Sequence, residues 1–308
     1  MGGHKFEKMK TRNINTTILG SVLFFLTSFA FAHPTGNMVT IGENVLWSYI
    51  NPINDPNHFA CVMIWTKGYE PKVYIQSEYA ASDYMLYNKQ NEIYIIERRF
   101  LKSSDEFHIR VLKSANGSQP KIIWDWFKDD YRIGEGGFFM LSDNQMVFGK
   151  YPEIYSLEKG EQPTEYFEFD NPIKKIRAVE HNKILLLGEN SCYLVQQNGN
   201  IIKQWDDLID PAVENAPMNR NQVFDADYSN EELLLSYWGR RSFDLINASG
   251  KRKIILQQSE PYTPHWVALW NKEKLLFSSQ LIFDGSTPKP HLTLLNEQNN
   301  HRVIWNTQ

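Results

Sequence analysis

The chain has 308 residues, of which 42% are hydrophobic, 22% are charged and 14% are aromatic. This composition supplies enough apolar material for a large core and excludes a disordered or collagen-like chain. The net charge is −4 at pH 7 and basic residues form no long run, which makes nucleic acid and anionic lipid surfaces poor candidate partners.

The first 32 residues have the pattern of a secretory signal peptide. They begin with a basic region formed by Lys5, Lys8, Lys10 and Arg12. An uncharged apolar stretch follows at 18–31, shorter than the roughly 20 residues of a membrane span, and Ala30-Phe31-Ala32 has the small-x-small pattern of a cleavage site. We therefore expect an exported protein, periplasmic or extracellular, whose mature chain has no membrane span. Translation starts at either Met1 or Met9, because Met9 also precedes a basic start.

A turn followed by an apolar strand recurs six times along the mature chain. The mean spacing is about 46 residues, within the range of repeat architectures. The apolar strands begin at Val45, Ile93, Met146, Ile184, Leu233 and Leu275. The turns before them are rich in Asn, Asp, Glu and Lys. Asn and Asp tolerate a left-handed backbone, so these turns suit tight hairpins.

Each unit continues with a third strand that alternates apolar and polar residues and a fourth strand that often carries an aromatic residue. Examples are Ile109-x-Val111 for the third strand and Tyr166-Phe167-x-Phe169 for the fourth. Alternation of period two favours strand over helix, and no segment shows a sustained helical stripe. Four strands in each of six units predict an all-β, six-bladed β-propeller. The alternatives are a seven-bladed ring, for which the chain leaves no room, and a pair of β-sandwiches.

We expect one propeller domain over residues 33–308, after the signal peptide at 1–32. The blades are expected near 38–78, 83–127, 137–170, 175–207, 222–258 and 265–308. The seven residues from Ser142 to Phe148, Ser-Asp-Asn-Gln-Met-Val-Phe, resemble the Ser-x-Asp-Gly-x-x-apolar repeat of TolB-like propellers. This resemblance extends over almost the whole mature chain as architecture, and it implies the same six-bladed fold.

Two consequences follow from the ring. Cys61 and Cys192 fall in third strands of the first and fourth blades, which lie opposite one another. A disulfide needs Cα atoms within about 7 Å, so the two thiols are expected to stay unpaired. The first strand at 38–41 and the last at 302–305 belong to blades that ring closure must set side by side.

Ligands of propellers usually meet the face where the second-to-third and fourth-to-first strand connections emerge. The polar and aromatic residues expected at the channel mouth on this face are Asp83, Tyr84, Arg132, Glu135, Arg177, Asp225, His265 and Trp266. Such a mixture of charges and rings could hold a polar ligand such as a sugar or a peptide end. The alternative is that these residues are solvated loop ends and ion pairs that close the ring.

Asp225 and Asp227 lie on one face of a strand, because side chains repeat every two residues. Two such carboxylates could ligate Ca²⁺ or act as an acid–base pair, as in calcium-dependent lactonase propellers. Calcium is the one cofactor left open; otherwise none is expected. The connection 261–264 carries two prolines and leads into His265, which we expect at the channel mouth, partly exposed, beside Trp266. In the competing arrangement the two side chains pack between blades.

Two functions remain open. The first is a monomeric binding or scaffold module for a protein or glycan ligand on one face of the ring. It is favoured by the lack of a catalytic motif such as G-x-S-x-G and by apparent long connections at 97–106, 206–222 and 278–290. Arginines and a tryptophan typical of binding surfaces lie near the rim, namely Arg98, Arg99, Trp238, Arg240 and Arg241. The alternative is a lactonase-like enzyme or an oligosaccharide lyase or hydrolase that uses Asp225, Asp227 and His265, with or without calcium.

Overall fold

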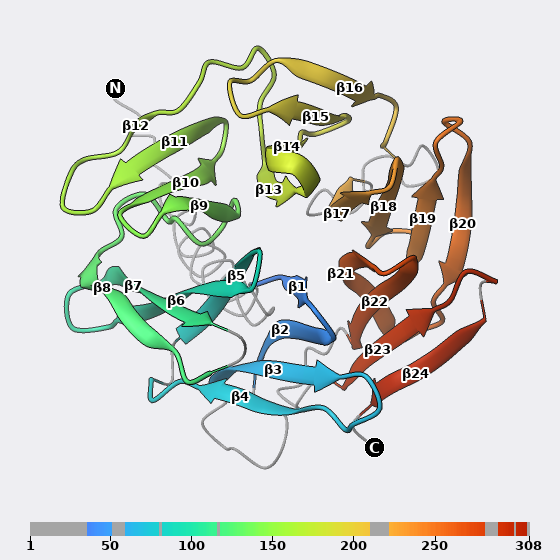
Figure 1. The fold of residues 1–308 in the computed structure, drawn as a ribbon, viewed down its shortest axis with the longest axis horizontal. Coiled ribbons are helices and arrows are strands. Elements are labelled where there is room, and N and C mark those ends of the chain that lie inside the picture. The colour runs from blue at the N-terminus through green and yellow to red at the C-terminus, as the bar shows by residue number, and fades with distance from the viewer. Residues whose placement is uncertain are drawn as a thin grey trace, which may run out of the picture. The chain divides into compact units, whose positions relative to one another are not determined.

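The computed structural model describes residues 36–50, 59–79, 82–115, 118–209, 222–280, 289–298 and 300–306. They form six four-stranded antiparallel sheets, arranged as blades around a central axis (Figure 1). The all-β, six-bladed propeller expected from the sequence is therefore confirmed. The expected signal peptide lies outside the described residues. Within the described part of the chain, no helix is long and apolar enough to cross a membrane.

Each blade is made of four consecutive strands, ordered from the centre outward. The first three blades contain β1 (Met38–Ile41), β2 (Asn44–Ile50), β3 (Ala60–Thr66), β4 (Lys72–Gln76), β5 (Ser82–Lys89), β6 (Glu92–Leu101), β7 (Glu106–Ala115), β8 (Lys121–Lys128), β9 (Phe138–Ser142), β10 (Gln145–Lys150), β11 (Glu153–Glu158) and β12 (Thr164–Glu165). The last three contain β13 (Lys175–Val179), β14 (Lys183–Leu187), β15 (Cys192–Gln196), β16 (Ile201–Trp205), β17 (Val223–Ser229), β18 (Glu232–Tyr237), β19 (Ser242–Ile246), β20 (Arg252–Gln257), β21 (Tyr262–Trp270), β22 (Glu273–Gln280), β23 (Pro290–Leu295) and β24 (His301–Asn306).

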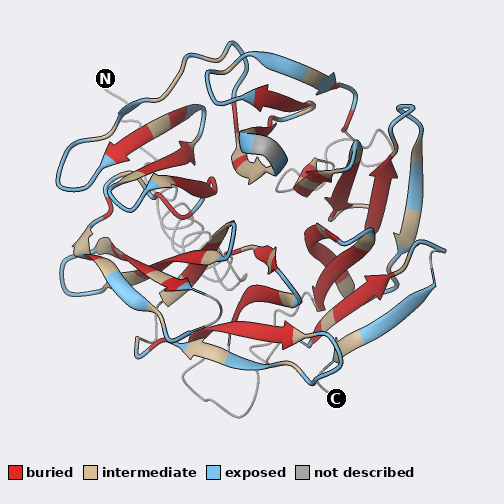
Figure 2. Cartoon of the chain, viewed as in Figure 1, coloured by how far each residue is buried: buried red, intermediate tan, exposed pale blue. Residues whose placement is uncertain are grey.

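The core lies between blades, because the inner strands of each sheet bury side chains on both faces. Along β2, Val45 and Trp47 belong to a cluster shared with blade six, whereas Leu46 belongs to a cluster shared with blade two. Side chains that alternate in direction along a strand thus fill two different interfaces. Figure 2 shows buried residues concentrated in the inner strands and exposed residues in the outermost ones.

The turn chemistry expected from the sequence is present. Asn230 and Glu231 have φ of 50° and 62°, and Asn271 and Lys272 have φ of 48° and 65°. Two successive left-handed residues match the twist of a two-residue hairpin, and Asn adopts that conformation more readily than most residues. The turn before β14 differs, because residues 180–182 form a short 3-10 helix, Glu180–Asn182.

Two further details depart from the sequence expectations. The outer strand of blade three comprises only Thr164–Glu165, and the expected aromatic residues Phe167 and Phe169 lie beyond its end. Phe169 instead packs edge-on against Tyr193 of blade four, with ring centroids 5.0 Å apart. The expected long connection at 97–106 is also wrong, because β6 and β7 continue through it as one long hairpin. The connections expected at 206–222 and 278–290 lie partly outside the described residues.

Both cysteines are free and buried, as expected from their opposite blades. Cys61 lies in β3 and Cys192 in β15. Burial raises the pKa of the Cys61 thiol to about 12 and raises that of Cys192 as well. The thiols are thus small core residues that stay protonated near neutral pH.

Candidate functional site

The innermost strand of each blade pairs with only one strand of its own sheet. Its other edge carries N–H and C=O groups that need partners. Side chains of neighbouring inner strands supply several of them. Asn37 donates through Nδ2 to Leu86 O at 2.7 Å and accepts from Leu86 N at 2.8 Å, which joins blades one and two. Lys89 donates to Leu141 O at 2.8 Å, which joins blades two and three.

Arg177 in β13 extends this bonding to three other blades. Its Nη1 donates to Ala226 O at 2.8 Å and to Val267 O at 3.0 Å, and its Nη2 donates to Met38 O. One guanidinium from blade four therefore binds the backbone of blades five, six and one. Arginine suits this role because its five donors point in fixed directions.

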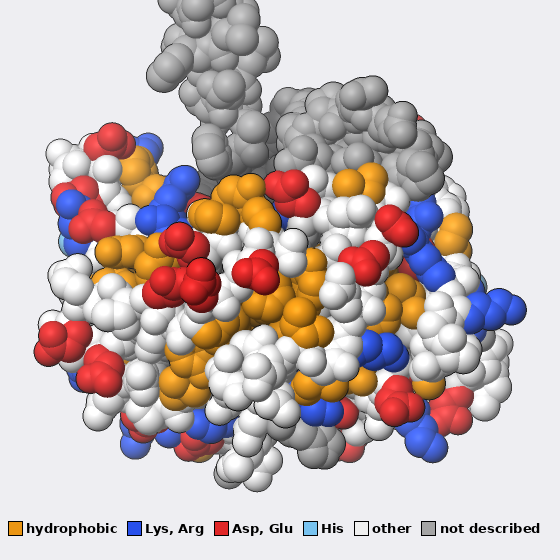
Figure 3. All heavy atoms as spheres, turned by 90° about the horizontal axis from the view of Figure 1, so that it is seen from above, with side chains coloured by type: hydrophobic (Ala, Val, Ile, Leu, Met, Phe, Trp, Pro, Cys, Tyr) orange, Lys and Arg blue, Asp and Glu red, His pale blue; other side chains and the backbone are white. Residues whose placement is uncertain are grey.

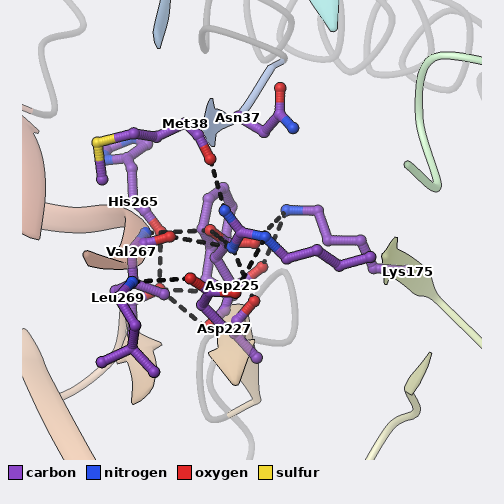
Figure 4. A network of polar contacts seen from close by, with 12 residues as sticks. Asn37, Met38, Lys175, Asp225, Asp227, His265, Val267 and Leu269 are labelled. Carbon is purple, nitrogen blue, oxygen red and sulfur yellow. Dashed lines mark hydrogen bonds and ion pairs between the residues drawn. The ribbon is translucent and has the colours of Figure 1, made fainter. Parts of the chain in front are cut away.

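The two acidic residues of β17, Asp225 and Asp227, contact cationic side chains of β13 and the backbone of β21 (Figure 4). Asp225 Oδ1 lies 3.0 Å from Lys175 Nζ, and Asp225 Oδ2 accepts from Val267 N at 3.1 Å. Asp227 Oδ1 lies 3.4 Å from Arg177 Nε, and Asp227 Oδ2 accepts from Leu269 N at 2.7 Å. Every carboxylate oxygen of the pair is therefore engaged by a donor or a cation. Burial raises the pKa of Asp227, and the Arg177 charge opposes that rise.

The space beside this network is small. A cavity on the channel side is lined by Asn37, Lys175, Arg177 and Asp225 together with apolar residues. It has room for about one water molecule. This cavity is therefore too small for a sugar or a peptide end.

The described residues contain no group of three or more His, Cys, Asp or Glu side chains placed to hold a metal ion. Asp225 and Asp227 face Lys175 and Arg177, so a calcium ion bound by the two carboxylates would have to displace both cations. In this cluster two buried carboxylates are neutralised by two cationic side chains.

A second cluster lies between blades two and three, around the buried Arg98 of β6. Its Nη2 lies 2.7 Å from Asp83 Oδ2 and its Nη1 lies 3.1 Å from Glu135 Oε1. Arg132 Nε lies 3.1 Å from the same Glu135 oxygen, and Phe107 packs under both guanidinium groups. Burial alone would lower the pKa of Arg98, but the two carboxylates raise it above its ordinary value. The cluster brings together three of the expected site residues, Asp83, Arg132 and Glu135. Arg98, which joins them, was expected only near the rim.

The expectation that His265 is partly exposed at the channel mouth is wrong. His265 is 1% exposed, and its Nδ1 lies 2.7 Å from Thr263 O. Trp266 is fully buried and stacks on Phe277 with centroids 4.6 Å apart. The expectation placed His265 at the start of the strand, after the connection 261–264. Instead β21 already begins at Tyr262, and its register shifts between Pro264 and Val267 at a bulge. These side chains pack as core.

Tyr84 is also a core residue rather than a channel residue. It is 1% exposed and lies in the cluster shared by blades one and two. The expected residues thus divide into the Arg98 cluster, the Arg177–Asp225 network and the core, and they form no single site. Lys175 was missed, although a signal for it exists. Lys175 and Arg177 alternate along one inner strand as Asp225 and Asp227 do along the next, which is the spacing of facing charge pairs.

No model of a known protein family matches the chain, and no curated protein matches it in sequence. Solved structures match it at low identity. A chain of the nidogen–laminin complex aligns with a TM-score of 0.51 and 11% identity, over 86% of this chain and 90% of that one. Virginiamycin B lyase from Staphylococcus aureus, in an inactive form with quinupristin, aligns with a TM-score of 0.49 and 10% identity, over 88% and 83%. At these identities the similarity supports the fold alone, and the matched structures include both an enzyme and a protein in complex with another.

Proposed function

We propose that the chain is an exported, monomeric binding module that holds a protein or glycan ligand on one face of the ring. The observation that carries this proposal is the state of the channel carboxylates. All four oxygens of Asp225 and Asp227 are occupied by donors or cations. A general acid or base must instead reach a proton of the substrate. The Asp225–Asp227 pair is therefore structural, which favours the rim and faces of the ring for binding.

The face with the second-to-third connections offers a surface of the right composition. The β6–β7 hairpin has strands of ten residues each, and residues 102–105 at its turn are exposed. Phe100 and Phe107 are half-buried near this turn, with ring centroids 5.0 Å apart. Aromatic rings beside arginines are the residue types enriched in binding hot spots. The hairpin is our candidate for the ligand-contacting element.

The outer edges of the blades support a monomer. Five exposed apolar residues on these strands lie beside a basic residue: Val73 with Lys72, Ile122 with Lys121, Ile202 with Lys203, Ile254 with Lys253, and Val303 with Arg302. Figure 3 views the rim from the upper edge of Figure 1 and shows apolar side chains lying among charged ones. Lysine and arginine on an edge strand oppose pairing with the edge of another molecule.

Two experiments test the proposal. The mature chain, residues 33–308, is screened against glycan and peptide arrays, and against lactone and oligosaccharide substrates for turnover. Saturable binding without turnover is expected, whereas turnover that depends on Asp225 would favour the lactonase-like or lyase alternative instead. Cell fractionation with mass spectrometry tests export, and the expected product begins at His33. Assignment to the TolB-like type stays a prediction.

A further inference from the structure

Two consecutive arginines in β6 both pack on aromatic rings, but only the first of them has carboxylate partners. Arg98 and Arg99 point to opposite faces of the strand, as successive strand residues do. Arg98 packs on Phe107 and is held by the carboxylates of Asp83 and Glu135. Arg98 therefore has both aromatic and carboxylate partners, and it serves as the reference with which Arg99 is compared.

Arg99 has the aromatic contacts without the carboxylates. Its Cζ lies 3.9 Å from the ring centroid of Trp126 and 4.7 Å from that of Tyr79. It makes no hydrogen bond or ion pair with any residue that the structure describes, and its Nε is buried without an acceptor. Because buried donors in native proteins are almost always satisfied, this orphan donor calls for a physical explanation.

Two acidic residues of the same sheet, Glu97 and Glu106, already have partners. Glu97 Oε2 lies 2.6 Å from Arg110 Nη2, and Glu97 Oε1 accepts from Ser77 Oγ at 2.9 Å. Glu106, near the hairpin turn, lies 3.2 Å from Lys128 Nζ. Arg110 is a second guanidinium over Trp126, with its Cζ 4.7 Å from the ring centroid. Lys128 is shared by Glu106 and Asp130, whereas Arg99 has no ion-pair partner among the residues that the structure describes.

We infer that Arg99 is the anchor for a carboxylate of an acidic protein segment, which the ring binds beside the β6–β7 hairpin. A guanidinium fork binds carboxylate oxygens bidentately, and contact with aromatic rings limits its freedom before binding. A protein segment is favoured over a sugar because guanidinium groups already occupy faces of Trp126 and Tyr79 on which a sugar could stack. Tryptophan, tyrosine and arginine together are also the composition of protein-binding hot spots. This inference rests on the proposed binding function and names its partner class.

The test uses the mature chain with ¹⁵N-labelled arginine, and the Nε–H signal of Arg99 is assigned from its loss in Arg99→Met. The probe is the peptide acetyl-Leu-Glu-Leu-amide, and its control is the same peptide with Gln in place of Glu. The Glu peptide is expected to shift the Arg99 signal saturably at millimolar concentration. The Gln peptide is expected to bind at least about tenfold more weakly, because a charge-assisted bond is lost.

Three variants complete the design. Arg99→Met keeps the apolar stem and is expected to lose at least about tenfold in affinity for the Glu peptide, measured by calorimetry, with an unchanged melting temperature. Lys251→Met removes an exposed charge from a turn of blade five, outside the β6–β7 hairpin, and it should bind like the parent chain. Arg98→Met is expected to lower the melting temperature, because it leaves Asp83 and Glu135 without their shared partner.

Several results would overturn the inference: equal binding of the Glu and Gln peptides, full binding by Arg99→Met, or no shift with either peptide. Glucuronate that saturates the Arg99 signal while the Glu peptide does not would assign the site to an acidic sugar and also overturn it. In each case a ligand found on the arrays would leave the proposed binding function intact. Arrays without any ligand would count against that function itself.

Discussion

Trp65 of blade one and Trp270 of blade six meet edge to face, with ring centroids 5.7 Å apart. Trp270 also donates through Nε1 to Gly42 O at 2.8 Å, and Lys67 lies 3.0 Å from Glu273 beside the pair. The first and last blades are therefore in direct contact, as we expected from closure of the ring. Large aromatic side chains suit this junction because each buries a wide apolar surface.

Trp270→Ala should destabilise the ring at this junction. The side chain is 5% exposed, and truncating a buried aromatic residue costs about 3–5 kcal/mol through lost burial and the cavity left behind. Urea unfolding measures the change in the free energy of unfolding. Trp270→Phe keeps a ring and should cost less than the alanine variant. Equal, small losses for both variants would contradict the role given to the Trp65–Trp270 contact.

Arg177→Met should destabilise the protein by about 3 kcal/mol, because it removes bonds to three blades and leaves Asp227 buried without its cation. Arg177→Lys keeps the charge but not the fork, so it should restore only part of the loss. A double-mutant cycle with Asp227→Asn measures the coupling directly. Additive effects of the two substitutions would show that the Arg177–Asp227 pair contributes nothing to stability.

His265→Ala should lower stability rather than ligand binding. The ring is 1% exposed and lies edge-on to Phe224, with centroids 5.4 Å apart. Removing it leaves a cavity, for which we expect a loss of about 2–4 kcal/mol in the free energy of unfolding. Calorimetric melts beside the binding assay separate the two effects. Weaker ligand binding with an unchanged melting temperature would show instead that His265 contributes to the ligand site.

The blade pattern could be predicted because strands buried on both faces appear in the sequence as short continuous apolar runs bounded by turns. Val45, Leu46 and Trp47 show this for a strand with two buried faces. The partnership of Asp83 with Arg98 could not be predicted in the same way. It depends on the register of β5 against β6, which sets these two residues opposite one another.

The environment of His265 could not be predicted from the sequence, for a related reason. The bulge in β21 places one extra residue between Pro264 and Val267, and an extra residue reverses the alternation of all side chains before it. No residue type in that stretch marks the bulge. Conversely, the alternating cations of β13 and acids of β17 are visible in the sequence once neighbouring blades are assumed to place their inner strands side by side.

Gly137→Ala should destabilise the junction of blades three and four. Gly137 has φ of +78°, and a Cβ there would lie 2.2 Å from Ile176 O. We expect a loss of about 2 kcal/mol or more, since both the left-handed backbone and the close approach penalise a side chain. Gly134→Ala in the same loop is the matched control, because a Cβ there meets nothing within 4 Å. Equal melting temperatures for the two variants would contradict this reading of the loop.

His291 in β23 should make the protein less stable as the pH falls. Burial lowers the pKa of its imidazole below the ordinary value of 6.5, and His301 lowers it further. Between the lowered folded value and 6.5 the unfolded chain binds more protons than the folded one, so the free energy of unfolding rises with pH through that window. The stability is present above 6.5 and is lost as the pH falls through the folded pKa. His291→Gln removes the titration, so its stability relative to the parent chain should improve on acidification. Urea unfolding of both proteins on either side of pH 6.5 measures the difference, and a difference that does not change with pH would show that His291 titrates alike in the folded and unfolded chains.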